Sequence, residues 1–152
     1  MNVLFLDFDG VLNTVDHNPV LPPPPFRPEP MSLDWLAYQL NPVLCNRVTR
    51  IAEQSGAALV LSTTWRNRFP LPRLATLMGS LGMPMPAGST PLLPGGSREM
   101  EIKHWLQQAS PMRWCVLDDD ELHIDHLVQT NDHISVSDED VERCLQILRS
   151  NS

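Results

Sequence analysis

Two aspartates near the start of the chain are the residues most able to do chemistry. Asp7 and Asp9 follow the short apolar run NVLFL, and Gly10 comes directly after them. Because strand side chains alternate between the two faces of a sheet, both carboxylates leave the strand end on the same side, about 6–7 Å apart along the chain. The ordinary alternative is a strand followed by an Asp-Gly turn.

A second acidic group follows another apolar run late in the chain. Asp118, Asp119 and Asp120 come directly after RWCVL, and alone they would suit a solvated loop. If the two groups meet at adjacent strand ends, like charges 4 Å apart repel by about 4 kcal/mol at an effective dielectric constant near 20. Such a cluster needs a counter-cation, and oxygen-only ligands favour Mg²⁺ over zinc.

Hydroxyl groups and a cation complete the candidate set. Ser62, Thr63 and Thr64 follow the apolar run AALVL, where a hydroxyl can either bind a phosphoryl oxygen or cap the strand end. Arg98 stands at the start of a predicted helix, where a cation could neutralise a transferring phosphoryl group. Lys103 lies more than a turn further along that helix, so we rank Arg98 first.

Apolar runs and segments with helical periodicity alternate along the chain. The strands and helices that they predict must position the candidate residues. The sequence predicts strands at residues 2–6, 57–61, 113–117 and 126–130, and helices at 41–55, 71–81, 97–108 and from 137 onward. The sequence MPM (83–85) is at best a weak edge strand. The helix over 41–55 is expected to bury Val43 together with Leu44, Val48, Ile51 and Ala52. The proline-rich residues 17–30 predict a stiff, extended excursion.

This alternation predicts an α/β fold: a three-layer, Rossmann-like, mostly parallel sheet with helices on both faces. Residues 1–152 are expected to form one domain, with the proline-rich loop at about 17–30. In such sheets ligands collect at the carboxyl ends of the strands, where the polar groups above are expected to meet.

Composition narrows the functional class. The net charge of −7 argues against a dedicated nucleic-acid-binding module, but allows a phosphorylated substrate held by a few local cations. Three cysteines without a CxxC pair argue against a disulfide framework or zinc site, which favours a cytoplasmic location. We expect no signal peptide and no membrane span, and nothing indicates a stable protein partner.

The order of these motifs resembles the haloacid dehalogenase (HAD) superfamily. The resemblance rests on D-F-D-G-V-L, an apolar strand ending in Ser/Thr, a cation before the next strand, and V-L-D-D, and it extends from residue 3 to about 130. The phrases G-A-A-L-V-L-S-T-T-W-R and E-I-x-x-W-L before V-L-D-D are also similar to the small phosphatase-like domains of Swiss Army knife RNA-repair proteins. The resemblance implies a HAD-type fold.

The resemblance also implies a mechanism. Asp7 would attack phosphorus to form an aspartyl phosphate, while Asp9 would protonate the leaving group and then activate water. Mg²⁺ would be held by Asp7, by the backbone carbonyl of Asp9, and by Asp118 or Asp119. Since dehalogenases of the superfamily lack the second aspartate, Asp9 favours phosphatase chemistry.

Thr63 (ranked before Ser62) and Arg98 would bind the transferring phosphoryl oxygens. The family usually has lysine at the last position, so Arg98 is a departure that keeps the charge.

Neither the proline-rich loop nor the connection at 82–96 is long enough to fold a separate cap domain. An open site implies a bulky or macromolecular substrate, with a nucleic-acid end as one candidate. Arg66, Arg68, Trp65 and the Arg27 loop would then form a phosphate track. The favoured alternative is a scattered surface with Trp65 packed under the loop.

Two other classes remain open at this stage. A receiver-like phospho-acceptor domain has similar groups, but its acidic pair and its phosphorylated aspartate occur in the reverse order. A non-catalytic phosphate-binding or interaction module of the same fold is the second, and the Asp7/Asp9 pair argues against it.

Overall fold

The structure, a computed structural model, describes residues 1–149 and is built on one parallel sheet. The strand order is β3-β2-β1-β4-β5, with β1 at Asn2–Leu6, β2 at Ala58–Leu61, β3 at Gly88–Ser89, β4 at Arg113–Asp118 and β5 at Leu127–Gln129. Leu6 of the central strand pairs in register with Leu61 and Leu117. The residues that follow these three therefore emerge together at one edge of the sheet.

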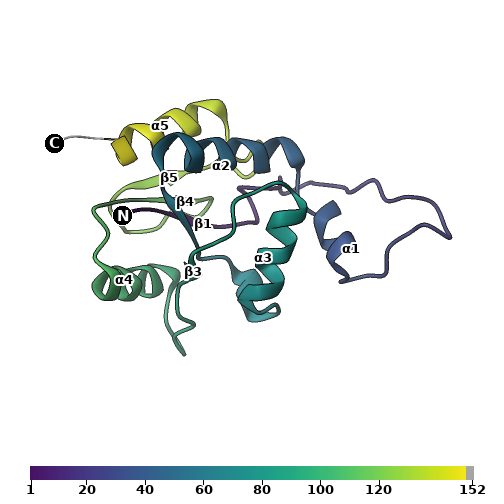
Figure 1. Cartoon of the computed structure of the whole chain (residues 1–152), viewed down its shortest axis with the longest axis horizontal. Helices are drawn as coiled ribbons and strands as arrows, with labels where there is room; N and C mark the ends of the chain where they lie inside the picture. Colours follow the sequence, from purple (N-terminus) through teal and green to yellow (C-terminus); the bar gives the residue numbers. More distant parts are fainter. Residues whose placement is uncertain (150–152) are drawn as a thin grey trace.

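Helices cover both faces of the sheet (Figure 1). They are α1 (Leu33–Tyr38), α2 (Pro42–Ser55), the 3₁₀ helix η1 (Thr64–Asn67), α3 (Leu71–Ser80), α4 (Arg98–Ala109) and α5 (Asp138–Arg149). One hydrophobic core joins the sheet to α2, α3 and α5, and a second joins its other face to α4. The described residues thus form the predicted three-layer α/β fold without a separate cap, and none of their helices has the length and apolar character needed to cross a bilayer.

Local sequence signals explain where the helices begin and end. Asn41 caps α2 by accepting a hydrogen bond from the Val43 N–H, and Gly56 ends that helix in the left-handed region at φ 71°. Ser97 caps α4 by accepting from the Met100 N–H, so Arg98 is the first residue of that helix. Its position at the helix start lets its side chain reach the neighbouring strand ends.

Most predicted elements are confirmed, and three details differ. The edge strand is not MPM but Gly88–Ser89, which pairs with Val60 and Leu61. Val43 is 59% exposed, because it lies in the first turn of α2 where the helix leaves the core. Neither helix α1 nor the 3₁₀ helix η1 was predicted.

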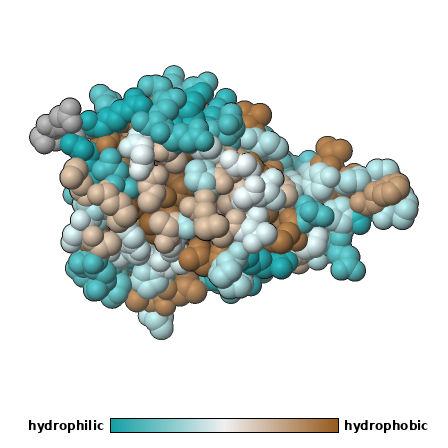
Figure 2. Space-filling model, in the orientation of Figure 1, coloured by the Kyte–Doolittle hydropathy of each residue, from teal (hydrophilic) through white to brown (hydrophobic). Residues whose placement is uncertain are grey.

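The proline-rich residues 17–30 contain neither helix nor strand, as expected. They form the loop that projects at the right of the molecule, next to α1 (Figure 1). Figure 2 shows hydrophobic residues on this projection, whereas the surface over α2 and α5 is hydrophilic. Val20 and Phe26 within this loop are 88% and 79% exposed.

Candidate active site

Asp7 lies at the carboxyl end of the central strand, almost out of contact with solvent. Residues 3–6 of β1 are fully buried, so the strand delivers Asp7 at 3% exposure. The Asp7 N–H donates to the Leu117 carbonyl at 3.2 Å, which continues the sheet by one residue. Its Oδ1 accepts from the Phe8 N–H at 2.9 Å. The backbone therefore fixes this carboxylate in place.

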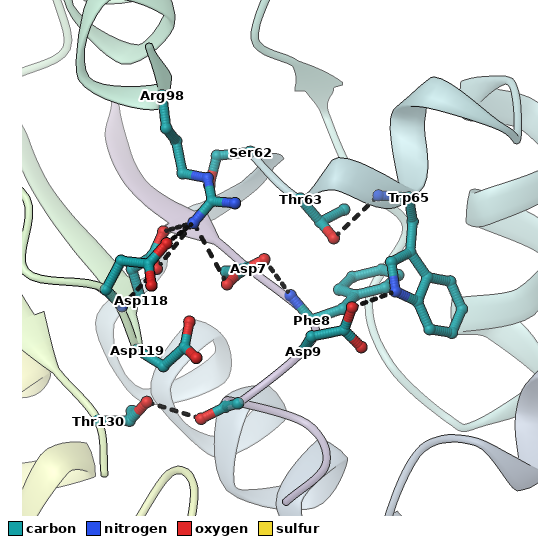
Figure 3. Close-up of polar contacts among 12 residues, drawn as sticks. Asp7, Phe8, Asp9, Ser62, Thr63, Trp65, Arg98, Asp118, Asp119 and Thr130 are labelled. Atoms are coloured by element: carbon teal, nitrogen blue, oxygen red, sulfur yellow. Dashed lines mark hydrogen bonds and ion pairs between the residues drawn. The ribbon is translucent and has the colours of Figure 1, made fainter. Parts of the chain in front are cut away.

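Two further carboxylates from the end of β4 meet Asp7. Asp7, Asp118 and Asp119 each offer an oxygen, and these three oxygens lie within 4.8 Å of one another. Asp118 is fully buried, and its Oδ1 accepts from the Asp120 N–H at 2.9 Å. The predicted meeting of the two acidic groups is thus present (Figure 3).

This cluster holds more negative charge than its surroundings neutralise. Burial and then the charge of Asp118 raise the pKa of Asp7 to about 9, although Arg98 opposes the shift. Burial also raises the pKa of Asp118 to about 6, again against Arg98. One guanidinium is therefore insufficient for the group.

Arg98 is the cation that enters the cluster. Its Nη1 lies 2.8 Å from Asp118 Oδ2, 3.6 Å from Asp7 Oδ2 and 3.2 Å from Asp120 Oδ2, with its side chain 15% exposed. All of these contacts use Nη1, so Nε and Nη2 keep donors for a further anion. Lys103, the competing candidate, is exposed and makes no hydrogen bond or ion pair through its ammonium with any residue in the described part of the chain.

The acidic group suits a hard divalent cation. It offers carboxylate oxygens alone, and the raised pKa values of Asp7 and Asp118 indicate that these two carboxylates lack positive charge. Gly10, at φ 78°, lets the chain turn so close to Asp119 that any Cβ would overlap its carboxylate. A glycine is therefore required for Asp119 to reach the other two carboxylates.

Asp9 lies apart from this group, at the exposed rim. Its Oδ1 accepts from Asn13 Nδ2 at 3.0 Å and its Oδ2 from Trp65 Nε1 at 3.1 Å. Asn13 also accepts from the Gly10 N–H at 3.0 Å, which links the turn to the carboxylate. The side chain of Asp9 is thus oriented by two neutral donors, and Figure 3 shows it between Asp7 and Trp65.

Ser62 and Thr63 follow β2 and are both fully buried. Thr63 caps η1 by accepting from the Trp65 N–H at 3.3 Å. Among the described residues, Ser62 Oγ has no hydrogen-bond partner although it is buried. Ser62 lies beside Arg98, and Thr63 lies between Asp7 and Trp65 (Figure 3). An unpaired buried hydroxyl is costly, so Ser62 needs a ligand or water at this position.

The structure excludes Arg66 from the phosphate track considered as the less favoured possibility, and it also buries this side chain, which the favoured scattered surface would leave exposed. Its side chain is 7% exposed, and Nη2 pairs with Glu101 Oε1 at 3.1 Å. Its Nε donates to the Thr63 carbonyl at 2.7 Å, and Nη1 donates to Thr90. Arg66 therefore ties the Ser62–Thr63 segment to α4 and is not free to bind phosphate.

Trp65 packs edge-on against Phe8, with ring centroids 5.2 Å apart. The favoured alternative expected Trp65 to be packed under the Arg27 loop; its ring is packed, but against Phe8 and Phe69, and its indole N–H also contacts Asp9. Arg27 donates to the Pro22 carbonyl at 3.3 Å within its own loop. Nothing in the sequence indicated the roles of Asn13 and Glu101, since their partners are set only by the folded chain.

A parallel sheet with Asp7 and Asp9 after its central strand, and with Asp118 and Asp119 at the end of the adjacent one, is the arrangement expected of the HAD superfamily. A family model described as "HAD domain in Swiss Army Knife RNA repair proteins" matches residues 3–141, and the chain belongs to this family. Comparison with curated proteins and with solved structures gave no significant match.

Proposed function

We propose that the protein is a Mg²⁺-dependent phosphomonoester hydrolase that works through an aspartyl-phosphate intermediate on Asp7. The observation that carries this proposal is the division of the carboxylates into two environments. Asp7 is buried beside the buried Asp118 and the half-buried Asp119, whereas Asp9 is held separately at the exposed rim. Membership of the HAD family supports phosphatase-type chemistry.

In the first step, an Asp7 carboxylate oxygen forms a bond to phosphorus as the bond from phosphorus to the leaving oxygen breaks. Asp9 gives its proton to that oxygen, so the leaving group departs as an alcohol. In the second step, Asp9 removes a proton from water, and the resulting hydroxide attacks phosphorus. Asp7 is released as a carboxylate together with inorganic phosphate.

Asp7, Asp118 and Asp119, with the backbone carbonyl of Asp9, would hold Mg²⁺ in this proposal. When bound, Mg²⁺ offsets the negative charge of the cluster and shields the attacking carboxylate from the charge of the phosphate. Side chains of the protein would bind the phosphoryl group and transfer the protons.

Arg98, Ser62 and Thr63 would bind the transferring phosphoryl oxygens. The Nε and Nη2 groups of Arg98 supply donors that its carboxylate contacts leave unused. The sequence ranked Thr63 before Ser62, but the unpaired Oγ favours Ser62 as a donor to the phosphoryl group. Thr63 already accepts at its Oγ1, yet its hydroxyl hydrogen remains available.

The open site suits a phosphate on a bulky or macromolecular substrate, and the name of the family directs the proposal to a nucleic-acid end. We further propose that residues 1–152 act as one domain and that the protein works in the cytoplasm.

Turnover of a chromogenic aryl phosphate tests this proposal. Wild-type activity should disappear in chelator and return with Mg²⁺. Asp7→Asn should abolish turnover because an amide cannot attack phosphorus. Asp9→Asn should reduce it by roughly 10²–10⁴-fold, with good leaving groups affected least in the first step. Full activity in chelator, or wild-type activity in Asp7→Asn, would contradict the mechanism. Absence of turnover on any phosphate would favour a non-catalytic module.

A further inference from the structure

A cavity of about 750 Å³ opens beside the candidate catalytic residues. Its walls come from the chain after β1, from α1, and from η1 with the residues that follow it. Asp9, Gly10 and Asp119 line one end, whereas Asp7 and Arg98 are not part of its lining. Its volume lies within the range of pockets that enclose small organic ligands.

The position of Asp9 indicates which part of a substrate this cavity would hold. A general acid must lie within hydrogen-bond reach of the oxygen to which it gives a proton. The leaving group therefore extends from Asp9 on the side away from Asp7, and the cavity is lined by Asp9 but not by Asp7. This step rests on the proposed function.

Aromatic rings form part of the cavity wall. The indole N–H of Trp65 donates to Asp9 Oδ2 at 3.1 Å, so this ring lies directly beside the candidate general acid. Its packing against Phe8 and Phe69, with centroids 5.2 and 6.2 Å away, fixes this ring. Trp35 of α1 lines the same cavity, and both tryptophans are only half-buried. Planar surfaces of this kind suit a stacked nucleobase.

A single unpaired arginine accompanies these rings. Arg68 lines the cavity and is exposed, and its guanidinium makes no hydrogen bond or ion pair within residues 1–149. The other basic side chain of the lining, His17, is hydrogen-bonded through Nε2 to the Tyr38 carbonyl at 2.9 Å. One available guanidinium suits one further phosphate, and a net charge of −7 does not favour a longer polyanion.

We propose that this cavity binds the terminal nucleotide of an end-phosphorylated oligonucleotide. Its base stacks on Trp35 and Trp65, its phosphorylated oxygen lies at Asp9, and its next phosphate contacts Arg68. The cavity therefore contacts one nucleotide and one internucleotide phosphate. Selectivity over simple phosphates comes from the stack and from Arg68.

Selectivity between dinucleotide phosphates and a simple phosphate tests the cavity separately from the chemistry. We would measure kcat/KM on a diribonucleotide with a terminal 5′-phosphate, on the same dinucleotide with a 3′-phosphate, and on glycerol phosphate, which lacks base and second phosphate. Wild type should prefer one of the dinucleotides over glycerol phosphate by at least 10-fold. Arg68→Ala should reduce that ratio about 5- to 10-fold, mainly through KM. It should also reduce the slope of log kcat/KM against log salt concentration by the amount that corresponds to about one phosphate contact.

Further variants complete the test. Trp35→Ala should reduce the same ratio by roughly 10-fold or more, with its melting temperature measured to verify folding. Arg68→Lys should keep most of the ratio. Lys103→Ala removes the same charge outside the cavity and should leave the ratio unchanged.

Binding supplies a readout that does not need turnover. Tryptophan fluorescence of Asp7→Asn should respond to the preferred dinucleotide, and the added Arg68→Ala change should weaken that binding about 5- to 10-fold. Turnover of glycerol phosphate without any dinucleotide preference, or equal behaviour of Arg68→Ala and Lys103→Ala, would overturn the cavity proposal and leave the phosphatase intact. Dinucleotide binding with no turnover of any phosphate would instead overturn the proposed function.

Discussion

Removal of the Arg98 guanidinium should affect both the folding and the chemistry of the site. Arg98 Nη1 lies 2.8 Å from Asp118 and 3.6 Å from Asp7, with its side chain 15% exposed. At an effective dielectric constant of 20, full charges at these distances attract by about 6 and 5 kcal/mol before desolvation is subtracted. Truncation of one partner of a buried pair usually costs a net 3–5 kcal/mol.

We expect the lower end of that range for Arg98→Ala, about 3 kcal/mol, because Asp7, with its pKa raised to about 9, already holds a proton near neutral pH, so that loss of the guanidinium leaves mainly Asp118 without a counter-charge. For a chain of this length, that corresponds to a melting temperature roughly 6–12 °C lower in the metal-free protein. This loss of stability follows from the structure alone, since the sequence gives no sign that Arg98 pairs with three carboxylates. Mg²⁺ should reduce the loss of stability because it supplies positive charge to the same oxygens.

Turnover should fall by about 10²–10³ in Arg98→Ala, even with saturating Mg²⁺, because a fixed cation no longer stabilises the developing phosphoryl charge. Steady-state kinetics on one aryl phosphate, together with thermal melts with and without Mg²⁺, measure both effects. Arg98→Lys should recover part of the rate, and Lys103→Ala should change it less than about threefold, because surface charges contribute little. Normal turnover in Arg98→Ala with a crippled Lys103→Ala would refute the reasoning and exchange the two roles.

Three further predictions concern the metal, the turn and the tie to α4. Because burial raises the pKa of Asp7 to about 9, the native metal-free protein retains a proton that the unfolded chain releases above about pH 4. Its melting temperature should therefore fall as pH rises from about 5 to 9. In scanning fluorimetry, Mg²⁺ should raise the melting temperature more at pH 8 than at pH 5.5. An equal rise in melting temperature at the two pH values would contradict this prediction. Gly10→Ala should displace Asp119 and raise the Mg²⁺ concentration for half-maximal activity by roughly 10–100-fold, whereas an unchanged Mg²⁺ titration would refute that role. Arg66→Ala should destabilise the protein by about 3–5 kcal/mol in denaturant melts because the buried Glu101 loses its ion-pair partner and keeps only the hydrogen bond from the Leu93 N–H. Arg66→Ala should also lower turnover, because Arg66 holds the Ser62–Thr63 segment in place. The added substitution Glu101→Gln removes the buried charge, so it should restore much of the stability but not the turnover. Recovery of both would show that Arg66 only neutralises Glu101.

The sequence was sufficient for the elements whose signals are local. The apolar strands before Asp7 and Asp118 and the Ser97 cap before Arg98 lie where they were predicted. Parallel pairing then brings the strand ends together whatever the details of the connections. This is why the acidic cluster could be predicted without coordinates.

Elements that depend on tertiary contacts could not be predicted. Strand β3 has only Gly88 and Ser89, which have no strand preference of their own, and it exists because its backbone pairs with β2. Helix α1 has only six residues and packs near α3, so it carries too little periodicity to detect.

The same limit applies within the site. The sequence offered a phosphate track or, as the favoured alternative, a scattered surface for Arg66, and it missed the buried ion pair because Glu101 is 35 residues away and the two side chains meet only in the fold. It left open the choice between Asp118 and Asp119, whereas both carboxylates lie within the cluster around Asp7. Motif spacing thus locates strand ends but does not determine how their side chains pair.

Direct trapping of the covalent intermediate tests the central claim. Wild-type protein would be mixed with Mg²⁺ and a phosphate-labelled substrate, quenched in acid within milliseconds to seconds, and mapped by peptide mass spectrometry. We predict a hydroxylamine-sensitive phosphoryl group on Asp7 that forms and decays at rates consistent with turnover and is absent from Asp7→Asn. Turnover by the wild-type protein with the label on another residue, or undiminished turnover and labelling in Asp7→Asn, would contradict the account.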